Sequence, residues 1–153
     1  MSLTDLITPN AVIAALKATN KKEAIQELSG KAAELTGQSA RAVAEILLQR
    51  EKLGSTGVGN GVAIPHGKLP KLTRLFGVFA RLQQPIDFEA LDNQPVDLIF
   101  LLLAPETAGA DHLKALARVA RHLRDQEVAQ RLRDSKDEAA IYEVLALPSA
   151  SAA

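Results

Sequence analysis

A histidine directly follows a proline in the stretch "GNGVAIPHGK" (residues 59–68), where glycines flank a short apolar run. Pro65 removes a backbone donor and fixes φ, which favours the end of a strand over its continuation. The glycines allow backbone to come close to whatever approaches the imidazole of His66. A neutral imidazole nitrogen in this setting can attack a phosphoryl group and form a phosphohistidine. The alternative is that His66 is a turn residue or a satisfied polar group.

A second histidine lies where a helix is predicted to begin. We predict Asp111 as the N-cap of a helix over residues 111–124, which places His112 in its first turn. The helix dipole favours anions there, free N–H groups can donate, and the imidazole tends to stay neutral. His112 is therefore a candidate neighbour for a phosphoryl group on His66. The alternative is an ordinary half-buried residue of the first turn.

The same helix is predicted to have one apolar face and one basic face. The apolar stripe consists of Leu113, Leu116, Val119, Ala120 and Leu123, with Lys114, Arg118 and Arg121 opposite. His122 lies about 110° from the centre of the stripe, so we expect it to be a solvated surface residue. Together with Arg124, the basic residues are expected to form a solvated face that could also meet an acidic partner.

Three further residues are candidates for binding a phosphoryl group. Arg50 ends a predicted helix and can act as a bidentate donor, although a cation at a helix end is also stabilised by the dipole alone. Thr56 can donate its hydroxyl, although turn chemistry also explains it. Gly61 ends the glycine-rich loop "GSTGVGNG" (residues 54–61), where bare backbone can come close to a phosphate.

Other chemistries lack their sequence patterns. The glycine-rich loop has neither the P-loop spacing nor the dinucleotide-binding spacing. His66 and His112 have no nearby set of further ligands, and no H-E-x-x-H or G-x-S-x-G occurs. We therefore expect no metal and no cofactor.

The composition bounds the class of protein. A chain of 153 residues suits one domain, which we place at residues 1–147, followed by a frayed tail at 148–153. Lys and Arg number 18 and so do Asp and Glu, so no global field favours nucleic acid or an anionic membrane. Cysteine is absent, no leader pattern opens the chain, and no apolar run approaches a membrane span. These features predict a cytoplasmic protein without membrane insertion.

The hydrophobic pattern alternates between strand-like and helical segments. Strands are expected at residues 10–16, 62–64, 74–82 and 94–106, and helices at 20–36, 39–54, 111–124, 127–133 and 136–146. The run 94–106 is the most apolar and suits a central strand covered on both faces. This alternation predicts an α/β fold, a mixed sheet with helices on both faces.

The residues around His66 also resemble a known family. "REKLGSTGVGNGVAIPHGK" (residues 50–68) closely resembles the active-site signature of phosphotransferase-system (PTS) enzyme IIA domains of the mannitol/fructose class. Residues 85–106 and 111–125 resemble the segments that follow in that family. Residues 56–69 and 90–100 are most similar to its nitrogen-regulatory branch. The likeness extends from residue 3 to about residue 145.

The resemblance implies a mixed five-stranded sheet sandwiched by helices on both faces. It also implies that His66 accepts a phosphoryl group from a small histidine-phosphorylated carrier protein, which is charged ultimately from phosphoenolpyruvate. His112 matches the family's second active-site histidine, which supports the phosphoryl group. Arg50 and Thr56 match the arginine and threonine of the motif.

The same resemblance implies a regulatory role. Members of the nitrogen-regulatory branch bind partners, such as potassium-transport components or sensor kinases, according to their phosphorylation state. Two alternatives stay open: a sugar-transport IIA that passes phosphate to a IIB domain, and a binding module that works by contact alone. A carrier of this kind is classed with transferases, without turnover of a small molecule of its own.

Overall fold

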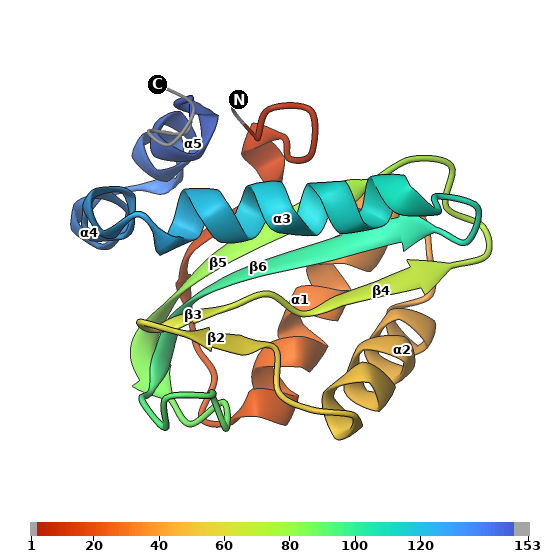
Figure 1. Cartoon of the computed structure of the whole chain (residues 1–153), viewed down its shortest axis with the longest axis horizontal. Coiled ribbons are helices and arrows are strands. Elements are labelled where there is room, and N and C mark those ends of the chain that lie inside the picture. Colours follow the sequence, from red (N-terminus) through yellow and green to blue (C-terminus); the bar gives the residue numbers. More distant parts are fainter. Residues whose placement is uncertain (1–2, 149–153) are drawn as a thin grey trace.

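A computed structural model describes residues 3–148 of the chain, so the predicted tail, apart from Pro148, lies outside the described residues (Figure 1). The strands are β1 (Val12–Leu16), β2 (Gly57–Gly59), β3 (Val62–Ala63), β4 (His66–Leu69), β5 (Phe76–Ile86) and β6 (Val96–Pro105). The helices are α1 (Lys21–Thr36), α2 (Ala40–Lys52), α3 (Ala110–Arg124), α4 (Gln126–Asp134) and α5 (Glu138–Ala146), preceded by a short 3-10 helix, η1 (Pro9–Ala11).

The first two helices begin and end where the sequence predicts. The side chain of Asn20 accepts a hydrogen bond from the backbone N of Glu23 at 2.8 Å, which caps α1. Gly37 ends that helix with a φ of 77°, a conformation that costs glycine little. The hydroxyl of Ser39 accepts from the backbone N of Ala42 at 3.2 Å and caps α2.

The sheet is mixed and is built around one buried strand. β6 pairs antiparallel with β5, which pairs parallel with β1 at one edge. On its other side β6 pairs in parallel with β3 and then with β4, and β2 pairs antiparallel with β3. Residues 98–104 of β6 are all fully buried, as expected for a strand covered on both faces.

Six strands are present because one strand beside β6 is interrupted. Val62 is opposite Leu98 and His66 is opposite Leu102, so β3 and β4 occupy the same side of β6 in succession. Pro65 lies at the interruption, where its carbonyl still accepts from the backbone N of Leu102 at 2.9 Å. His66 therefore opens β4, whereas the sequence places it just after a strand.

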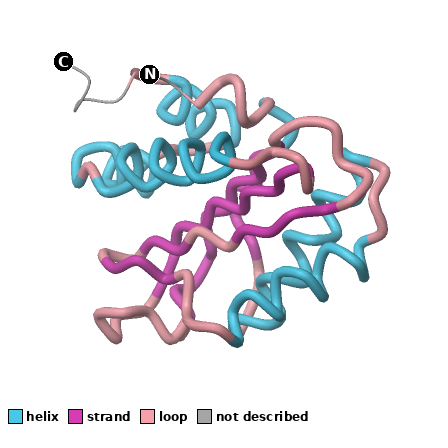
Figure 2. The backbone as a smooth tube through the Cα atoms, turned by 45° about the vertical axis from the view of Figure 1, so that its right-hand side comes forward, coloured by secondary structure: helices cyan, strands magenta, loops and turns pink. Residues whose placement is uncertain are grey.

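Helices cover both faces of the sheet, which confirms the predicted α/β sandwich. α1 and α2 pack on one face, and α3 crosses the other, with α4 and α5 beyond it (Figures 1 and 2). The fully buried aromatic residues of the core are Phe79, Phe88 and Phe100. The sheet thus carries His66 on β4 between α2 and the beginning of α3.

Two arginines tie the helices α3 and α4 to the rest of the fold. Arg118 of α3 forms a bidentate ion pair with Asp5, at 2.9 and 2.5 Å. Arg81 of β5 donates to the carbonyl of Ala14 in β1 and to that of Leu132 near the end of α4, both at 2.9 Å. These planar, many-donor side chains bind backbone and carboxylate groups that come from distant parts of the chain.

The prediction that Asp111 caps α3 is wrong. The helix begins at Ala110, its N-cap is Gly109 with a φ of 56°, and no side chain caps it. Glycine tolerates this left-handed conformation, which turns the chain sharply from the end of β6 into the helix. His112 nevertheless lies in the first turn, as expected.

The predictions for the two faces of α3 are also partly wrong. His122 is fully buried instead of solvated, and its Nε2 lies 3.3 Å from the carbonyl of Val144 in α5. Leu113, assigned to the buried stripe, is 68% exposed. The reason is that the buried face of α3 includes both of its histidines. The buried residues of this helix are His112, Ala115, Val119, His122 and Leu123. A helical wheel considers one helix alone, so it cannot show that α5 lies against His122.

The close packing of β4 on α2 gives a first testable prediction. A Cβ at Gly67 would lie 2.6 Å from the Cγ2 atom of Ile46, so Gly67→Ala forces β4 and α2 apart. We expect a loss of about 1–3 kcal/mol in the free energy of unfolding, measured by urea denaturation. The matched control is Gly30→Ala in α1, where nothing lies within 4 Å, and which should gain about 0.5–1 kcal/mol. Equal effects of the two changes would contradict the packing.

Candidate functional site

The ring of His66 is held in one orientation by backbone. Its Nδ1 lies 2.9 Å from the carbonyl of Ile64, on the other side of Pro65. A carbonyl only accepts, so Nδ1 carries the proton and Nε2 keeps a lone pair. Burial lowers the pKa of this half-buried imidazole, against the effect of the Ile64 bond, and the charge of Arg50 lowers it further. The ring is therefore neutral near pH 7, with Nε2 as its nucleophilic atom.

The second predicted histidine faces the first. The ring centroids of His66 and His112 lie 5.5 Å apart, with the ring planes at 60°. His112 is 8% exposed, and within residues 3–148 its buried Nε2 has no hydrogen-bond partner. Burial lowers the pKa of His112, and a proton on His66 or the charge of Lys68 acts in the same direction. Two neutral imidazoles from β4 and α3 thus meet at one place.

Two cations lie near these rings. Arg50, in the last turn of α2, donates from Nη1 to the carbonyl of Gly54 at 2.9 Å, and its charge lowers the pKa of His66. Lys68 follows His66 by two residues in β4, so both side chains are on the same face of the strand. The sequence reasoning gave Lys68 no role; the alternation of side chains along a strand after His66 was the signal that could have found it.

In the structure, Thr56 and Gly61 both form hydrogen bonds with other groups of the protein. Thr56 is 4% exposed, and its hydroxyl donates to the carboxylate of Glu51. Gly61 is beside Asp97 and Leu98, whose backbone N–H groups bind its carbonyl at 3.0 and 3.1 Å. A Cβ at Gly61 would lie 2.5 Å from Nη2 of Arg133, so a close approach of protein, not of a ligand, accounts for this glycine.

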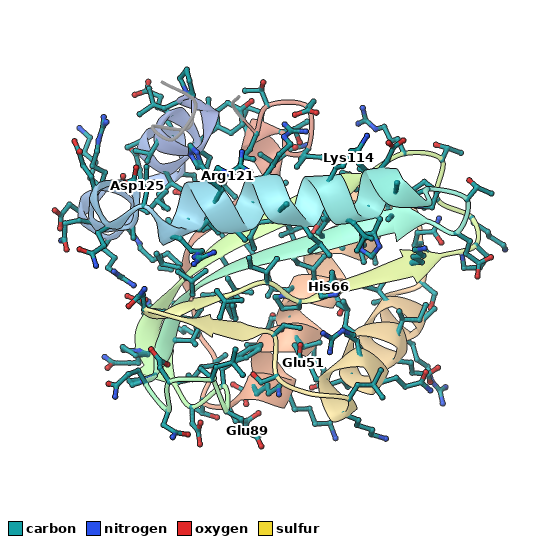
Figure 3. The ribbon with its side chains drawn as sticks, viewed as in Figure 1. Glu51, His66, Glu89, Lys114, Arg121 and Asp125 are labelled. Atoms are coloured by element: carbon teal, nitrogen blue, oxygen red, sulfur yellow. The ribbon has the colours of Figure 1, made fainter. Side chains whose placement is uncertain are left out.

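Glu51 is the polar residue that the sequence reasoning missed. It follows Arg50 at the end of α2 and is 8% exposed, although it is charged. Figure 3 shows Glu51 and His66 in the region where the end of α2 approaches β2, β3 and β4. No spacing in the sequence signals a buried carboxylate at this position, because helix-end glutamates are ordinarily solvated.

Within residues 3–148, no three or more histidine, aspartate or glutamate side chains gather in a way that could hold a metal ion. Over the same residues, none of the helices combines the length and the apolarity needed to cross a bilayer.

The fold matches solved structures of phosphotransferase-system IIA proteins. The crystal structure of nitrogen regulatory protein IIA-Ntr from Neisseria meningitidis superimposes with a TM-score of 0.88 at 32% identity, over 94% of this chain and 98% of that chain. The chain belongs to the family described as "Phosphoenolpyruvate-dependent sugar phosphotransferase system, EIIA 2", whose model matches residues 5–147.

Relatives of two kinds occur in this family. The chain is 70% identical to the nitrogen regulatory protein of Bradyrhizobium diazoefficiens over 153 residues, which covers all of both chains. It is 33% identical over 148 residues to the PTS system fructose-specific EIIABC component of Bacillus subtilis, covering 95% of this chain but 23% of that protein. A further relative, the PTS system fructose-specific EIIA component of Haloferax volcanii, is 35% identical over 150 residues, which cover 95% of this chain and 97% of that protein.

The buried histidines give a prediction on stability and pH. Burial lowers the pKa of His122, against the effects of Val144 and Asp125, and it also lowers those of His66 and His112. Histidine in the unfolded chain has a pKa of about 6.5, so the unfolded state takes up protons first as pH falls. The stability that these neutral histidines contribute is therefore fully present above about pH 6.5. It is lost as pH falls from there through the lower pKa values of the folded state.

We expect urea denaturation to report this loss between about pH 7.5 and pH 5.5. His122→Gln keeps an amide donor near the Val144 carbonyl but does not titrate, so its stability should depend less on pH. The difference in slope for one histidine is at most about 1.4 kcal/mol per pH unit. A variant with the slope of the unaltered protein would contradict the assignment of His122.

Proposed function

We propose that this chain is a phosphohistidine carrier and regulator of the nitrogen branch of the phosphotransferase system. His66 accepts a phosphoryl group from a histidine-phosphorylated carrier protein and presents it to other proteins. The observation that carries this proposal is the fixed ring of His66, with its proton on Nδ1 and its lone pair on Nε2. Nearby lies an imidazole nitrogen of His112 that has no hydrogen-bond partner among residues 3–148.

The reaction is an in-line transfer between two imidazoles. The lone pair on Nε2 of His66 attacks phosphorus, and a new N–P bond forms there. The N–P bond of the donor histidine breaks, and its electron pair returns to the donor ring. No proton needs to leave Nε2, because the hydrogen bond to Ile64 keeps the proton on Nδ1. Catalysis then consists of positioning and of stabilising the charge on the transferred group.

The neighbours of His66 supply that stabilisation. With a proton on Nε2, His112 donates to a phosphoryl oxygen and satisfies a nitrogen that is otherwise buried without a partner. Arg50, which is half-buried and donates to the carbonyl of Gly54, swings to a second oxygen as a bidentate donor. Lys68 adds a positive charge on the same face of β4. Thr56 and Gly61 have no role in this scheme, because the hydroxyl of Thr56 binds Glu51 and the side chain of Arg133 lies against Gly61.

The surroundings of the site suit a transient encounter with another protein. Leu53 is 85% exposed close to Arg50 in the chain, and Leu113 is 68% exposed next to His112. Phosphorylation adds about −1.5 to −2 charges to a chain of zero formal net charge. A change of this size alters which partners bind, and these partners include regulated proteins such as potassium-transport components or sensor kinases in the cytoplasm.

A second candidate function is sugar transport, in which the phosphoryl group passes from His66 to a IIB domain. The observation that favours it is the match to one part of the fructose-specific component of Bacillus subtilis. The identity of 70% over the whole length of a nitrogen regulatory protein favours the first candidate. Transfer from the phosphorylated chain to an isolated fructose IIB domain, at the rate of a transport IIA, would support the second.

The first test follows labelled phosphate into the chain. With labelled phosphoenolpyruvate, the first enzyme and the carrier of the nitrogen branch, we expect acid-labile, alkali-stable label on the unaltered protein. His66→Ala should carry no label because its acceptor nitrogen is missing. His112→Ala should become labelled on the order of a hundredfold more slowly, because the acceptor is present but one donor to the phosphoryl group is lost.

Phosphorus NMR of the labelled protein tests the position of the new bond, which we expect on Nε2. Each variant is first compared with the unaltered protein by circular dichroism to establish that it folds. Label that persists on His66→Ala, or a phosphoryl group found on Nδ1, would refute the proposed acceptor.

A further inference from the structure

A buried ion pair between Glu51 and Lys21 lies close enough to the candidate phosphate acceptor, His66, to act on its ring. The carboxylate of Glu51 pairs with Nζ of Lys21 at 2.8 Å, and their side chains are 4% and 15% exposed. Nζ of Lys21 also lies 5.1 Å from the centre of the Phe88 ring. The pair therefore joins the start of α1 to the end of α2 in a setting with little water.

The position of Glu51 is unfavourable for the helix that carries it. A carboxylate in the last turn of α2 lies near the negative end of the helix dipole, and its burial adds a cost of desolvation. Lys21 and two donors from Thr56 compensate this charge: the backbone N of Thr56 at 3.1 Å and the hydroxyl of the same residue. Residues that break a local rule while being fully satisfied are expected at functional sites.

Hydrogen bonds lead from Glu51 to the ring of His66. Glu51 fixes Thr56, and the carbonyl of Thr56 accepts from the backbone N of Ile64 at 3.0 Å. The carbonyl of the same Ile64 then binds Nδ1 of His66 at 2.9 Å. Every member between the carboxylate and the imidazole is buried, with Thr56 and Ile64 at 4% exposure. The position and tautomer of the ring thus depend on where Glu51 holds Thr56.

The charge of Glu51 also reaches the ring. It raises the pKa of His66, whereas burial, the largest effect, and the charge of Arg50 lower it. Two successive residues at the end of α2 therefore act on the same imidazole with opposite sign. Arg50 is half-buried and donates to one backbone carbonyl, whereas the carboxylate of Glu51 is buried between Lys21 and Thr56, so the two residues have different roles.

We propose that Glu51, held by Lys21, is a positioning residue for phosphoryl transfer, acting through Thr56 and Ile64 to keep the neutral ring of His66 in place and in the tautomer with its lone pair on Nε2. This inference rests on the proposed phosphorylation of His66 but adds residues that the transfer itself does not touch. It also reassigns Thr56, whose hydroxyl orders the loop instead of binding phosphate.

The test compares two glutamates on the same helix. Glu51→Gln removes the buried carboxylate, and Glu45→Gln removes an exposed one that pairs with Arg41 at 3.3 Å. Both lose one negative charge from α2, so a general effect of charge is matched. We expect Glu51→Gln to accept phosphate from the carrier about tenfold to a hundredfold more slowly, because a small displacement of a reacting group has effects of this size. Glu45→Gln should transfer at the rate of the unaltered protein.

A second pair of variants keeps the test open if Glu51→Gln does not fold. Thr56→Val removes the hydroxyl but keeps the shape of the side chain, and Thr56→Ser keeps the hydroxyl. We expect slow transfer for Thr56→Val and near-normal transfer for Thr56→Ser. Each rate is measured well below the thermal midpoint of the variant, so that loss of folded protein does not contribute.

NMR of the nitrogen-15-labelled imidazole gives a readout that does not require transfer. The unaltered protein should show His66 with its proton on Nδ1 alone, and Glu51→Gln and Thr56→Val should show a mixture of both tautomers. The pKa of His66 should also fall in Glu51→Gln, because a nearby negative charge is lost. A solely structural role for Glu51 would lower the thermal midpoint and leave His66 in a single tautomer.

The outcomes separate this inference from the proposed function. If the unaltered protein accepts no phosphate, the proposed function fails, whatever the variants show. If it does accept phosphate but Glu51→Gln transfers equally fast and keeps one tautomer, the positioning role of Glu51 is overturned and the proposed function stands.

Discussion

The interruption of the strand at Pro65 is the constraint on which the candidate site depends. In a continuous strand beside β6, successive backbone carbonyls would face β6 and β2 in turn. Because Pro65 has no N–H, only its carbonyl bonds to β6, and the regular ladder is interrupted until it resumes at His66. The carbonyl of Ile64 is then available to the imidazole two residues later, and one hydrogen bond selects the tautomer of the ring.

The rest of the molecule positions the second imidazole opposite the first. β6 is buried on both faces and fixes the register of β4 through four paired residues. The chain leaves the end of β6, turns at Gly109 and enters α3, so His112 of the first turn faces His66 of β4. The ion pair between Arg118 and Asp5 then anchors the middle of α3 to the N-terminal segment. The relative position of the His66 and His112 rings thus follows from the central strand β6 and from the sharp turn at Gly109 that begins α3.

Much of this arrangement could be predicted from residue types and spacing. Asn20, Gly37 and Ser39 mark helix ends because capping is a local property, and the apolar run of β6 predicts a buried strand. The short strand β2 is not predicted because it consists of "GVG", which has little strand propensity, and it forms by pairing with β3 from a later part of the chain. The burial of His122 depends on α5, and that of Glu51 depends on Lys21, which is 30 residues earlier in the chain. Such contacts are tertiary, and no pattern within one element contains them.

The hydrogen bond that orients His66 is made by the peptide group of residue 64, and every amino acid has such a carbonyl. The choice of the ring nitrogen that keeps its lone pair is therefore encoded in the path of the main chain, not in the identity of a neighbouring side chain. Scores that count identical residues will overlook this part of the site, whereas superposition of backbones will detect it.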